Sequence, residues 1–219
     1  MLETAIVAFT TFFATIGPVD VAVIYAALTR DSSAEIKTSM ALRGCLVAGI
    51  ILICFALAGD RLLTSLGISL AAFKFAGGIL LLLIAIDMVF ARTSGGTSTT
   101  DEETQEALGK EDVSVFPLAT PLIAGPGTMG AVILLMANAE DDLLTQGIVM
   151  AALLAVLLIT LILLLLANKV QQWLGVTGIH VISRIFGILL AALAVQFMFD
   201  GIASSGLFPL PTSITPGLN

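Results

Sequence analysis

The chain has 219 residues, of which 58% are hydrophobic and 11% are charged, and its mean hydropathy is +1.09. This composition excludes an ordinary water-soluble domain and is typical of an integral membrane protein. The formal net charge is −7 at pH 7, and this acidic balance argues against a nucleic-acid partner. We expect membrane lipid and a small-molecule substrate as partners instead.

Six stretches approach the roughly 20 apolar residues that a helix needs to cross the hydrocarbon core of a membrane. In chain order they are 5–28, 41–59, 72–91, 115–137, 146–167 and 185–204. The first has no basic region before it, so we interpret it as a retained span rather than a cleaved signal peptide. The sequence therefore predicts an all-α integral membrane protein with six transmembrane helices.

Lysine and arginine residues indicate how these spans are oriented, because cytoplasmic loops carry the positive excess. Two of them, Arg61 and Lys74, fall on one side of the predicted membrane. The other seven follow the first, third and fifth spans: Arg30, Lys37, Arg43, Arg92, Lys110, Lys169 and Arg184. This distribution predicts a multi-pass protein of the inner (plasma) membrane with both termini outside.

The two halves of the chain resemble each other on either side of a polar stretch. An offset of 108 aligns Gly17-Pro18 with Gly125-Pro126, and an offset of 109 aligns 77–90 with 186–199, which pairs Asp87 with Gln196. Because each half holds three spans, the second copy must enter the membrane from the opposite side. We predict two inverted three-helix repeats, 1–92 and 115–219 with a C-terminal tail, joined by a cytoplasmic linker, 93–114.

Each Gly-Pro pair lies near the middle of its span, the first and the fourth. Proline lacks an N–H and clashes with the preceding turn, and backbone freed in this way must be covered by protein or water within a membrane. The pattern predicts helices broken at Gly-Pro that meet at the midplane. The alternative for each pair is a simple proline kink with no ligand.

A broken helix presents the positive N-terminal end of one half-helix and the carbonyl end of the other. A zwitterion carries a charge for each end, and the small side chains around the breaks favour a small ligand. The candidate substrate-binding residues are Thr15, Ile16, Gly17, Pro18, Asp20, Thr120, Ala124, Gly125, Pro126, Gly127 and Thr128.

Three further polar residues lie in the predicted spans, where an ionisable side chain is costly unless it is paired or hydrated. Asp20 either binds a substrate ammonium, a coupling proton or a sodium ion, or it caps free amides of its own half-helix. Asp87 is either a coupling residue or an end charge beside Arg92. Gln196 is either a coupling residue or an interhelical hydrogen-bond partner. His180 falls in a glycine-rich stretch that we predict to be a loop.

Three segments together resemble the signature regions of the MarC family, which includes the archaeal SnatA amino-acid transporters. They are TFFATIGPVDVAVIYAALTR at 11–30, PLATPLIAGPGTMGAVILL at 117–135 and RIFGILLAALAVQFMFDGI at 184–202. The resemblance implies a six-span inner-membrane protein of the LysE-like exporter group, active on glycine and alanine, with its site in 15–20 and 120–128. Many relatives have Asn-Pro at the first break, where this chain has Gly17-Pro18.

The function that these patterns favour is secondary transport, by export or exchange, of small neutral amino acids, with proton or sodium coupling and no cofactor. The alternative is a channel or passive facilitator for another small solute, although no charged ring or filter motif points to one. The sequence holds no nucleophile–base or HExxH grouping, so we do not expect an enzyme.

Cys45 and Cys54 have neither disulfide nor metal-site spacing. A homo-oligomer is compatible with the sequence.

Overall fold

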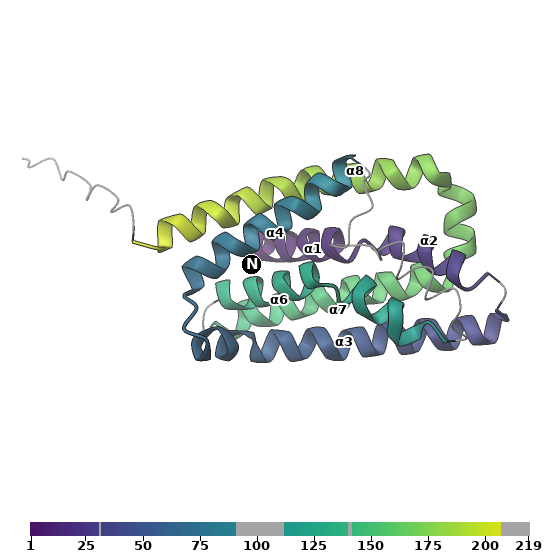
Figure 1. The fold of residues 1–219 in the computed structure, drawn as a ribbon, viewed down its shortest axis with the longest axis horizontal. Helices are drawn as coiled ribbons and strands as arrows, with labels where there is room; N and C mark the ends of the chain where they lie inside the picture. The colour runs from purple at the N-terminus through teal and green to yellow at the C-terminus, as the bar shows by residue number, and fades with distance from the viewer. Residues whose placement is uncertain (31, 91–111, 140–141, 207–219) are drawn as a thin grey trace, which may run out of the picture.

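The computed structural model describes residues 1–30, 32–90, 112–139 and 142–206, and every regular element among them is a helix. The helices form an elongated bundle whose long axis follows the spans (Figure 1). In chain order they are α1 (Leu2–Ile16), α2 (Pro18–Leu28), α3 (Ala34–Ser65), α4 (Leu70–Phe90), η1 (Ser114–Ile123), α6 (Pro126–Asn138), α7 (Leu143–Leu165) and α8 (Ala167–Ser204).

Five helical stretches in the described residues are long and apolar enough to cross a membrane. They are Leu2–Leu28, Ala34–Gly59, Leu70–Phe90, Leu143–Leu165 and His180–Ser204. The pair η1 and α6 gives a sixth if it counts as one span bent by 53°. Both ends of the described chain, residues 1 and 206, lie toward the same end of the bundle, as an even number of crossings requires (Figure 1). The predicted all-helical membrane fold is confirmed.

One expectation differs from the structure. The stretch around His180 is helical, not a loop, because α8 runs without interruption from Ala167; no proline falls inside it, and an isolated glycine costs a helix only about 1 kcal/mol. At the end of the predicted linker, 93–114, Asp112 accepts a hydrogen bond from the backbone N–H of Ser114 (2.9 Å), the first residue of η1. Residues 93–111 and the tail 207–219 lie outside the described residues.

The interrupted spans occupy the centre of the bundle. In the most apolar window of Leu2–Leu28, 56% of residues are buried, against 28–39% in the other four unbroken spans. α7 packs along α1 and α2, and α3 packs along η1 and α6, so the second span of each half covers the broken span of the other. Large exposed side chains on α3, α4, α7 and α8, such as Leu46, Leu80, Leu158 and Ile188, give these helices an apolar surface suited to lipid.

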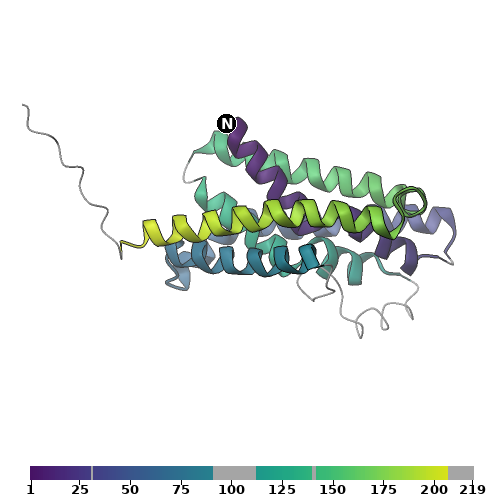
Figure 2. The ribbon, with the colours of Figure 1, turned by 90° about the horizontal axis from the view of Figure 1, so that it is seen from above.

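α4 and α8 lie side by side over much of their length (Figures 1 and 2). Glycines permit this close approach. A Cβ atom placed on Gly78 would lie 2.7 Å from Ala194 O, and one placed on Gly187 would lie 3.1 Å from Ala85 O. At the sequence offset of 109, Gly187 corresponds to Gly78 and Ala194 corresponds to Ala85. The second contact therefore joins the residues equivalent to those of the first.

The two cysteines of α3 have different surroundings. Both are free thiols, and Cys45 is buried whereas Cys54 is exposed.

Candidate functional site

The first break is a single residue. Gly17 ends α1 and begins α2 with φ 59° and ψ 58°, a left-handed conformation that glycine adopts without penalty. Its N–H donates to Phe13 O (3.0 Å), and its carbonyl accepts from Val21 N (3.0 Å). Because Pro18 has no N–H, the carbonyl of Ala14 loses its helical donor. The predicted break at Gly17-Pro18 is confirmed.

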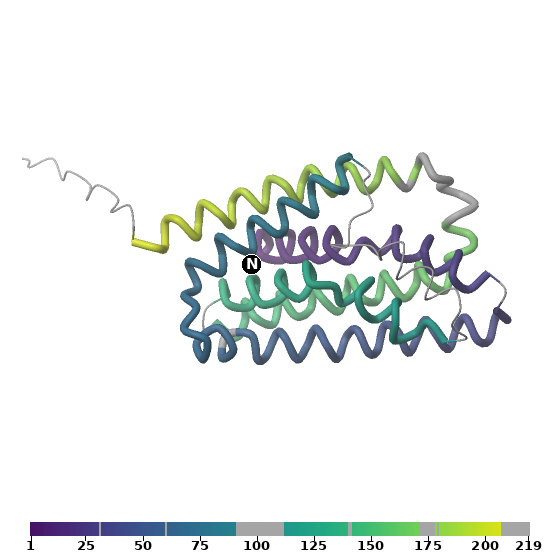
Figure 3. Tube along the Cα trace, viewed as in Figure 1, coloured from purple at the N-terminus to yellow at the C-terminus, as the bar shows by residue number. Residues whose placement is uncertain are grey.

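The second break is wider. η1 is a π-type helix with non-helical backbone at Phe116 and Thr120, and it ends at Ile123. Gly125 then takes an extended conformation (φ −83°, ψ 169°) before Pro126 begins α6. Figure 3 shows the change of direction between η1 and α6, whereas α1 continues into α2. The predicted break at Gly125-Pro126 is also confirmed.

The two breaks lie at a similar depth in the bundle. α1 contacts α6 and α2 contacts η1, so the broken spans run side by side in opposite directions (Figure 1). The N-terminal ends of α2 and α6 therefore both lie inside the protein, each with its first amides free of helical partners. This arrangement brings the two groups of predicted site residues, 15–20 and 120–128, to the same level.

Asp20 occupies the third position of α2, and its partner is a serine of α8. Ser183 Oγ donates to the carboxylate, at 2.7 Å from Oδ2 and 3.0 Å from Oδ1. Among the described residues no backbone amide donates to Asp20, so the structure does not show the capping arrangement. Sequence analysis missed Ser183, because a serine in an apolar span carries no signal of its own. His180 lies one turn before Ser183 on α8.

A small cavity of about 10 Å³ adjoins this hydrogen bond. It is bordered by the break itself, Gly17 and Asp20, and by Met88 of α4 and Ser183 and Phe186 of α8. A volume of this size accommodates about one water molecule or a small cation. A water molecule in this cavity would lower the cost of the Asp20 charge within a span.

The threonines near the breaks differ in their hydrogen bonding. Thr15 Oγ1 donates to Thr11 O (2.9 Å), which satisfies it within α1. The hydroxyls of Thr11 and Thr128 are buried and have no hydrogen-bond partner among the described residues. Buried hydroxyls are usually satisfied, so these two identify polar positions that a water, ion or substrate could complete.

The other predicted site residues surround the breaks with different exposure. Ile16, Pro18, Ala124, Gly125 and Gly127 are buried, Gly17 and Thr120 are half-buried, and Pro126 is exposed. Backbone and small side chains therefore form most of the surface at the breaks, which agrees with the expectation of a small ligand.

Gln196 and Asp87 lie away from the breaks. Gln196 Nε2 donates to Asp200 Oδ1 (2.8 Å) one turn later in the same helix, so this hydrogen bond is intrahelical. Gln196 and Asp200 border a cavity of about 310 Å³ between α1, α6, α7 and α8, and Glu3 also lines this cavity. Asp87 is half-buried in α4, and its predicted partner Arg92 lies outside the described residues.

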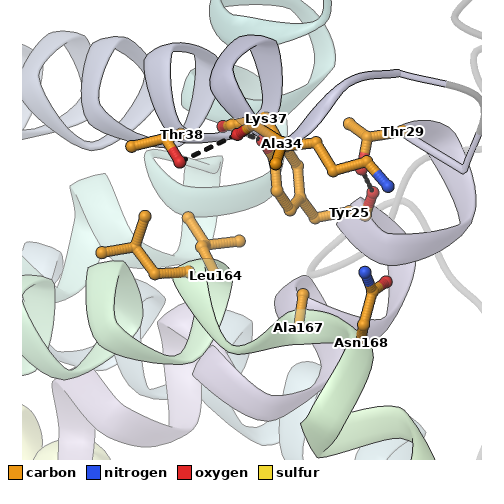
Figure 4. A pocket seen from close by; sticks show the side chains of 9 residues that line it. Tyr25, Thr29, Ala34, Lys37, Thr38, Leu164, Ala167 and Asn168 are labelled. Carbon is orange, nitrogen blue, oxygen red and sulfur yellow. Dashed lines mark hydrogen bonds between the residues drawn. The ribbon is translucent and has the colours of Figure 1, made fainter.

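A further pocket of about 140 Å³ opens at the opposite end, between α2, α3 and the junction of α7 and α8 (Figure 4). Tyr25 Oη donates to Lys37 O (2.5 Å), and Thr29 Oγ1 donates to Tyr25 O (2.8 Å). These polar groups are therefore engaged with backbone. Asn168 and the Lys37 side chain complete the polar edge.

Five apolar spans, or six if η1 and α6 are counted as one, define an integral multi-pass membrane protein. Residues 2–205 match the family described as MarC family integral membrane protein, and the chain belongs to this family. It is 38% identical to the UPF0056 membrane protein MJ1677 of Methanocaldococcus jannaschii, over 92% of this chain and 97% of the relative.

Bacterial relatives extend the similarity. The chain is 30% identical to the UPF0056 membrane protein YvbG of Bacillus subtilis, over 94% of this chain and 96% of the relative. It is 33% identical to YhcE of Escherichia coli, over 90% of each chain. These names describe membrane proteins and give no substrate. No solved structure matches the chain.

Proposed function

We propose that this protein is a secondary transporter of small neutral amino acids such as glycine and alanine, working in the inner membrane with both termini outside. The observation that carries the proposal is the pair of interrupted helices, whose N-terminal ends lie inside the bundle at a similar depth, next to the half-buried carboxylate of Asp20. Interrupted helices at the midplane are the usual binding elements of secondary transporters.

The charges at the breaks suit a zwitterion. Helix N-termini favour a carboxylate, and Asp20 together with the unpaired carbonyls at the end of α1 favours an ammonium group or a cation. The surrounding residues are glycine, alanine, proline and threonine, which suit a ligand without a large side chain, and the cavity of about 10 Å³ beside Asp20 must widen to admit it. No organic cofactor is needed for such a cycle, and we expect no enzymatic reaction.

The internal symmetry supports transport over a fixed channel. The contact between Gly78 and Ala194 is repeated by Gly187 and Ala85, and Gly49 packs on Leu157, its own counterpart at offset 108 (3.6 Å from a Cβ placed on Gly49). These reciprocal contacts support two inverted repeats. Such a duplication gives a protein two equivalent arrangements that open to opposite sides.

Transport assays on reconstituted protein test the proposal. Uptake and counterflow of radiolabelled glycine and alanine are measured in proteoliposomes under imposed proton and sodium gradients, for the wild type and for Asp20→Asn. We expect gradient-dependent accumulation by the wild type and at least a tenfold loss in the variant, because the amide cannot carry the charge that pairs with a cation or proton.

Asp200→Asn is the matched control, since it makes the same change at a carboxylate that borders the 310 Å³ cavity rather than a break. We expect it to keep most of the transport activity. Flux of other small solutes without counterflow would support a passive facilitator in place of the transporter, and no flux of glycine or alanine under any gradient would reject the proposed substrates.

A further inference from the structure

The two half-helix N-termini are equivalent in sequence but different in chemistry. The offset of 108 that aligns the Gly-Pro pairs places Asp20 opposite Thr128, and both are the third residue of their half-helix. At α2 the protein supplies its own carboxylate. At α6 the equivalent position carries a hydroxyl and no negative charge.

The hydroxyl at α6 has no partner. Thr128 is 1% exposed, and its Oγ1 has no hydrogen bond within the described residues. Side chains of a helix lean toward its N-terminus, so this hydroxyl points toward the end of α6 where the first amides are free. Three donors therefore face the N-terminal end of α6: the amides of Gly127 and Thr128 and the Thr128 hydroxyl. The helix dipole makes this end favourable for an anion.

The two ends also differ in how they are covered. Pro18 and Ala22 in the first turns of α2 are buried, and Ser183 and Phe186 of α8 border the small cavity together with Gly17 and Asp20. The counterparts of Pro18 and Ala22 at α6 are Pro126, which is exposed, and Gly130, where an added Cβ would meet no atom within 4 Å. The N-terminus of α6 is thus less closely covered than that of α2, where the cavity measures only about 10 Å³.

We infer that the N-terminus of α6 is the carboxylate-binding subsite for the substrate, and that the substrate's carboxylate takes there the place that the Asp20 carboxylate takes at α2. The inference rests on the proposed function and names its recognition chemistry. The amides of Gly127 and Thr128 and the Thr128 hydroxyl hold the carboxylate, and Asp20 is left to attract the ammonium group or a cation.

Ligand binding to the purified full-length protein tests the subsite. Radiolabelled alanine is displaced with propionate, which has the carboxylate alone, and with propylamine, which has the amine alone. Propionate also serves as a direct ligand in thermal-shift titrations. We expect propionate to compete with alanine, and Thr128→Val to weaken alanine and propionate about tenfold while propylamine is unaffected, because a hydrogen bond to a charged group is lost.

Two further variants separate the subsite from a structural role. Thr128→Ser restores the hydroxyl and should restore binding to within about threefold of the wild type. Thr160→Val makes the same change at a buried threonine of α7 whose hydroxyl donates to Val156 O (2.8 Å), and it should leave the affinity for alanine unchanged. Equal weakening by Thr128→Val and Thr160→Val would overturn the inference, as would an unaltered affinity in Thr128→Val.

The outcomes distinguish this inference from the proposed function. If the wild type binds propionate but not alanine, and Thr128→Val removes propionate binding, the carboxylate subsite stands and the amino-acid substrate is rejected. If alanine binds and is transported but propionate neither binds nor competes, the transporter stands and the subsite is rejected. If no carboxylate binds at all, both are rejected.

Discussion

Gly17 joins α1 to α2 in a conformation that side chains disfavour. Its φ is 59°, yet an added Cβ would lie 3.5 Å from Asp20 Oδ2, at ordinary van der Waals distance. Gly17→Ala should therefore destabilise the protein through its backbone alone, by about 1–2 kcal/mol. Thermal unfolding in detergent measures the change.

Gly130→Ala is the control for this substitution. Gly130 lies inside α6 with open space around it, and alanine in a helix interior is favoured over glycine by about 0.5–1 kcal/mol. We expect this variant to be as stable as the wild type or more so. Equal loss of stability in both variants would show that the left-handed conformation of Gly17 is not the cause.

Asp142 begins α7 and provides a pH-dependent prediction outside the membrane spans. Its carboxylate accepts hydrogen bonds from the Thr145 hydroxyl and from Leu144 N, and these bonds hold its pKa below the ordinary value of 3.8. A lowered pKa stabilises the folded state above the ordinary value, and this stabilisation is lost as the pH falls through the lowered one.

Asp142→Asn keeps a side-chain oxygen at the start of α7 but cannot titrate. We expect the wild type to have the higher melting temperature at neutral pH, and the difference to shrink as the pH falls below 3.8. Melting curves of both proteins over a series of pH values measure this. A difference that stays constant over the whole series would contradict the assigned hydrogen bonds.

At the residue scale the sequence located the breaks and Asp20 but not its partner. Gly-Pro pairs and an acid within an apolar span are rare enough to be informative. Ser183 is not, since a serine becomes significant only when folding brings it to Asp20 from 163 positions away. The unpartnered hydroxyl of Thr128 is likewise a property of packing that composition does not reveal.

The α4–α8 pair shows how elements of this protein approach each other. An added Cβ on Gly78 would lie 2.7 Å from Ala194 O and 3.0 Å from Met198 N, both backbone atoms that cannot rotate away. Gly78→Ala should force the helices apart and destabilise the protein by about 1–3 kcal/mol. Thermal unfolding in detergent again measures it.

Gly147→Ala makes the same change in α7, where an added Cβ meets nothing within 4 Å. We expect no loss of stability there. A Gly78→Ala protein as stable as Gly147→Ala would mean that α4 and α8 pack less closely than described.

At the element scale most helices could be predicted, because apolar runs of membrane length leave few alternatives. The ends of α3 and α8 could not, since each helix continues beyond its apolar run into sequence with polar residues. The difference in width between the two breaks was also beyond the sequence. Pro117 and Pro121 lie inside η1, and their effect on its path depends on the packing of α3 against it.

The two inverted repeats that we propose are not related by an exact two-fold symmetry. Ser183 of α8 binds Asp20, so symmetry would place its counterpart Lys74 beside Thr128. Gly77, one turn further along α4 than Lys74, instead lies 3.4 Å from Leu134 (Cβ position to Cδ2). Leu134 is six residues past Thr128, and Lys74 is three residues before Gly77. Lys74 therefore lies about nine residues, or about 13 Å along the helix, from the level of Thr128, and it is displaced toward the N-terminal end of the bundle.

A transporter with inverted repeats should also adopt the exchanged arrangement, in which the α4–α8 pair is displaced the other way. Gly77 and Leu134 then separate, and their counterparts Phe186 and Ala26 come together. In a protein without Cys45 and Cys54, G77C/L134C should cross-link in the arrangement described, and A26C/F186C in the exchanged one.

Cross-linking yield in membranes, with and without alanine, measures the two populations. We expect both pairs to react, and alanine to change their ratio. Rapid reaction of G77C/L134C with none of A26C/F186C under every condition would show that the displacement is permanent. At this scale the two inverted repeats stay a prediction of the sequence, and the displacement could not be predicted from it, because the same helices could pack in either arrangement.

The contrast between the two thiols of α3 has a practical consequence. Cys45 is enclosed and Cys54 faces outward from an apolar stretch, so a lipid-soluble maleimide dye should label the native chain at one position only. A fluorophore at Cys54 would report on the bilayer next to α3 without any engineered residue. Its emission in nanodiscs of different thickness would show how deeply this position lies in each bilayer.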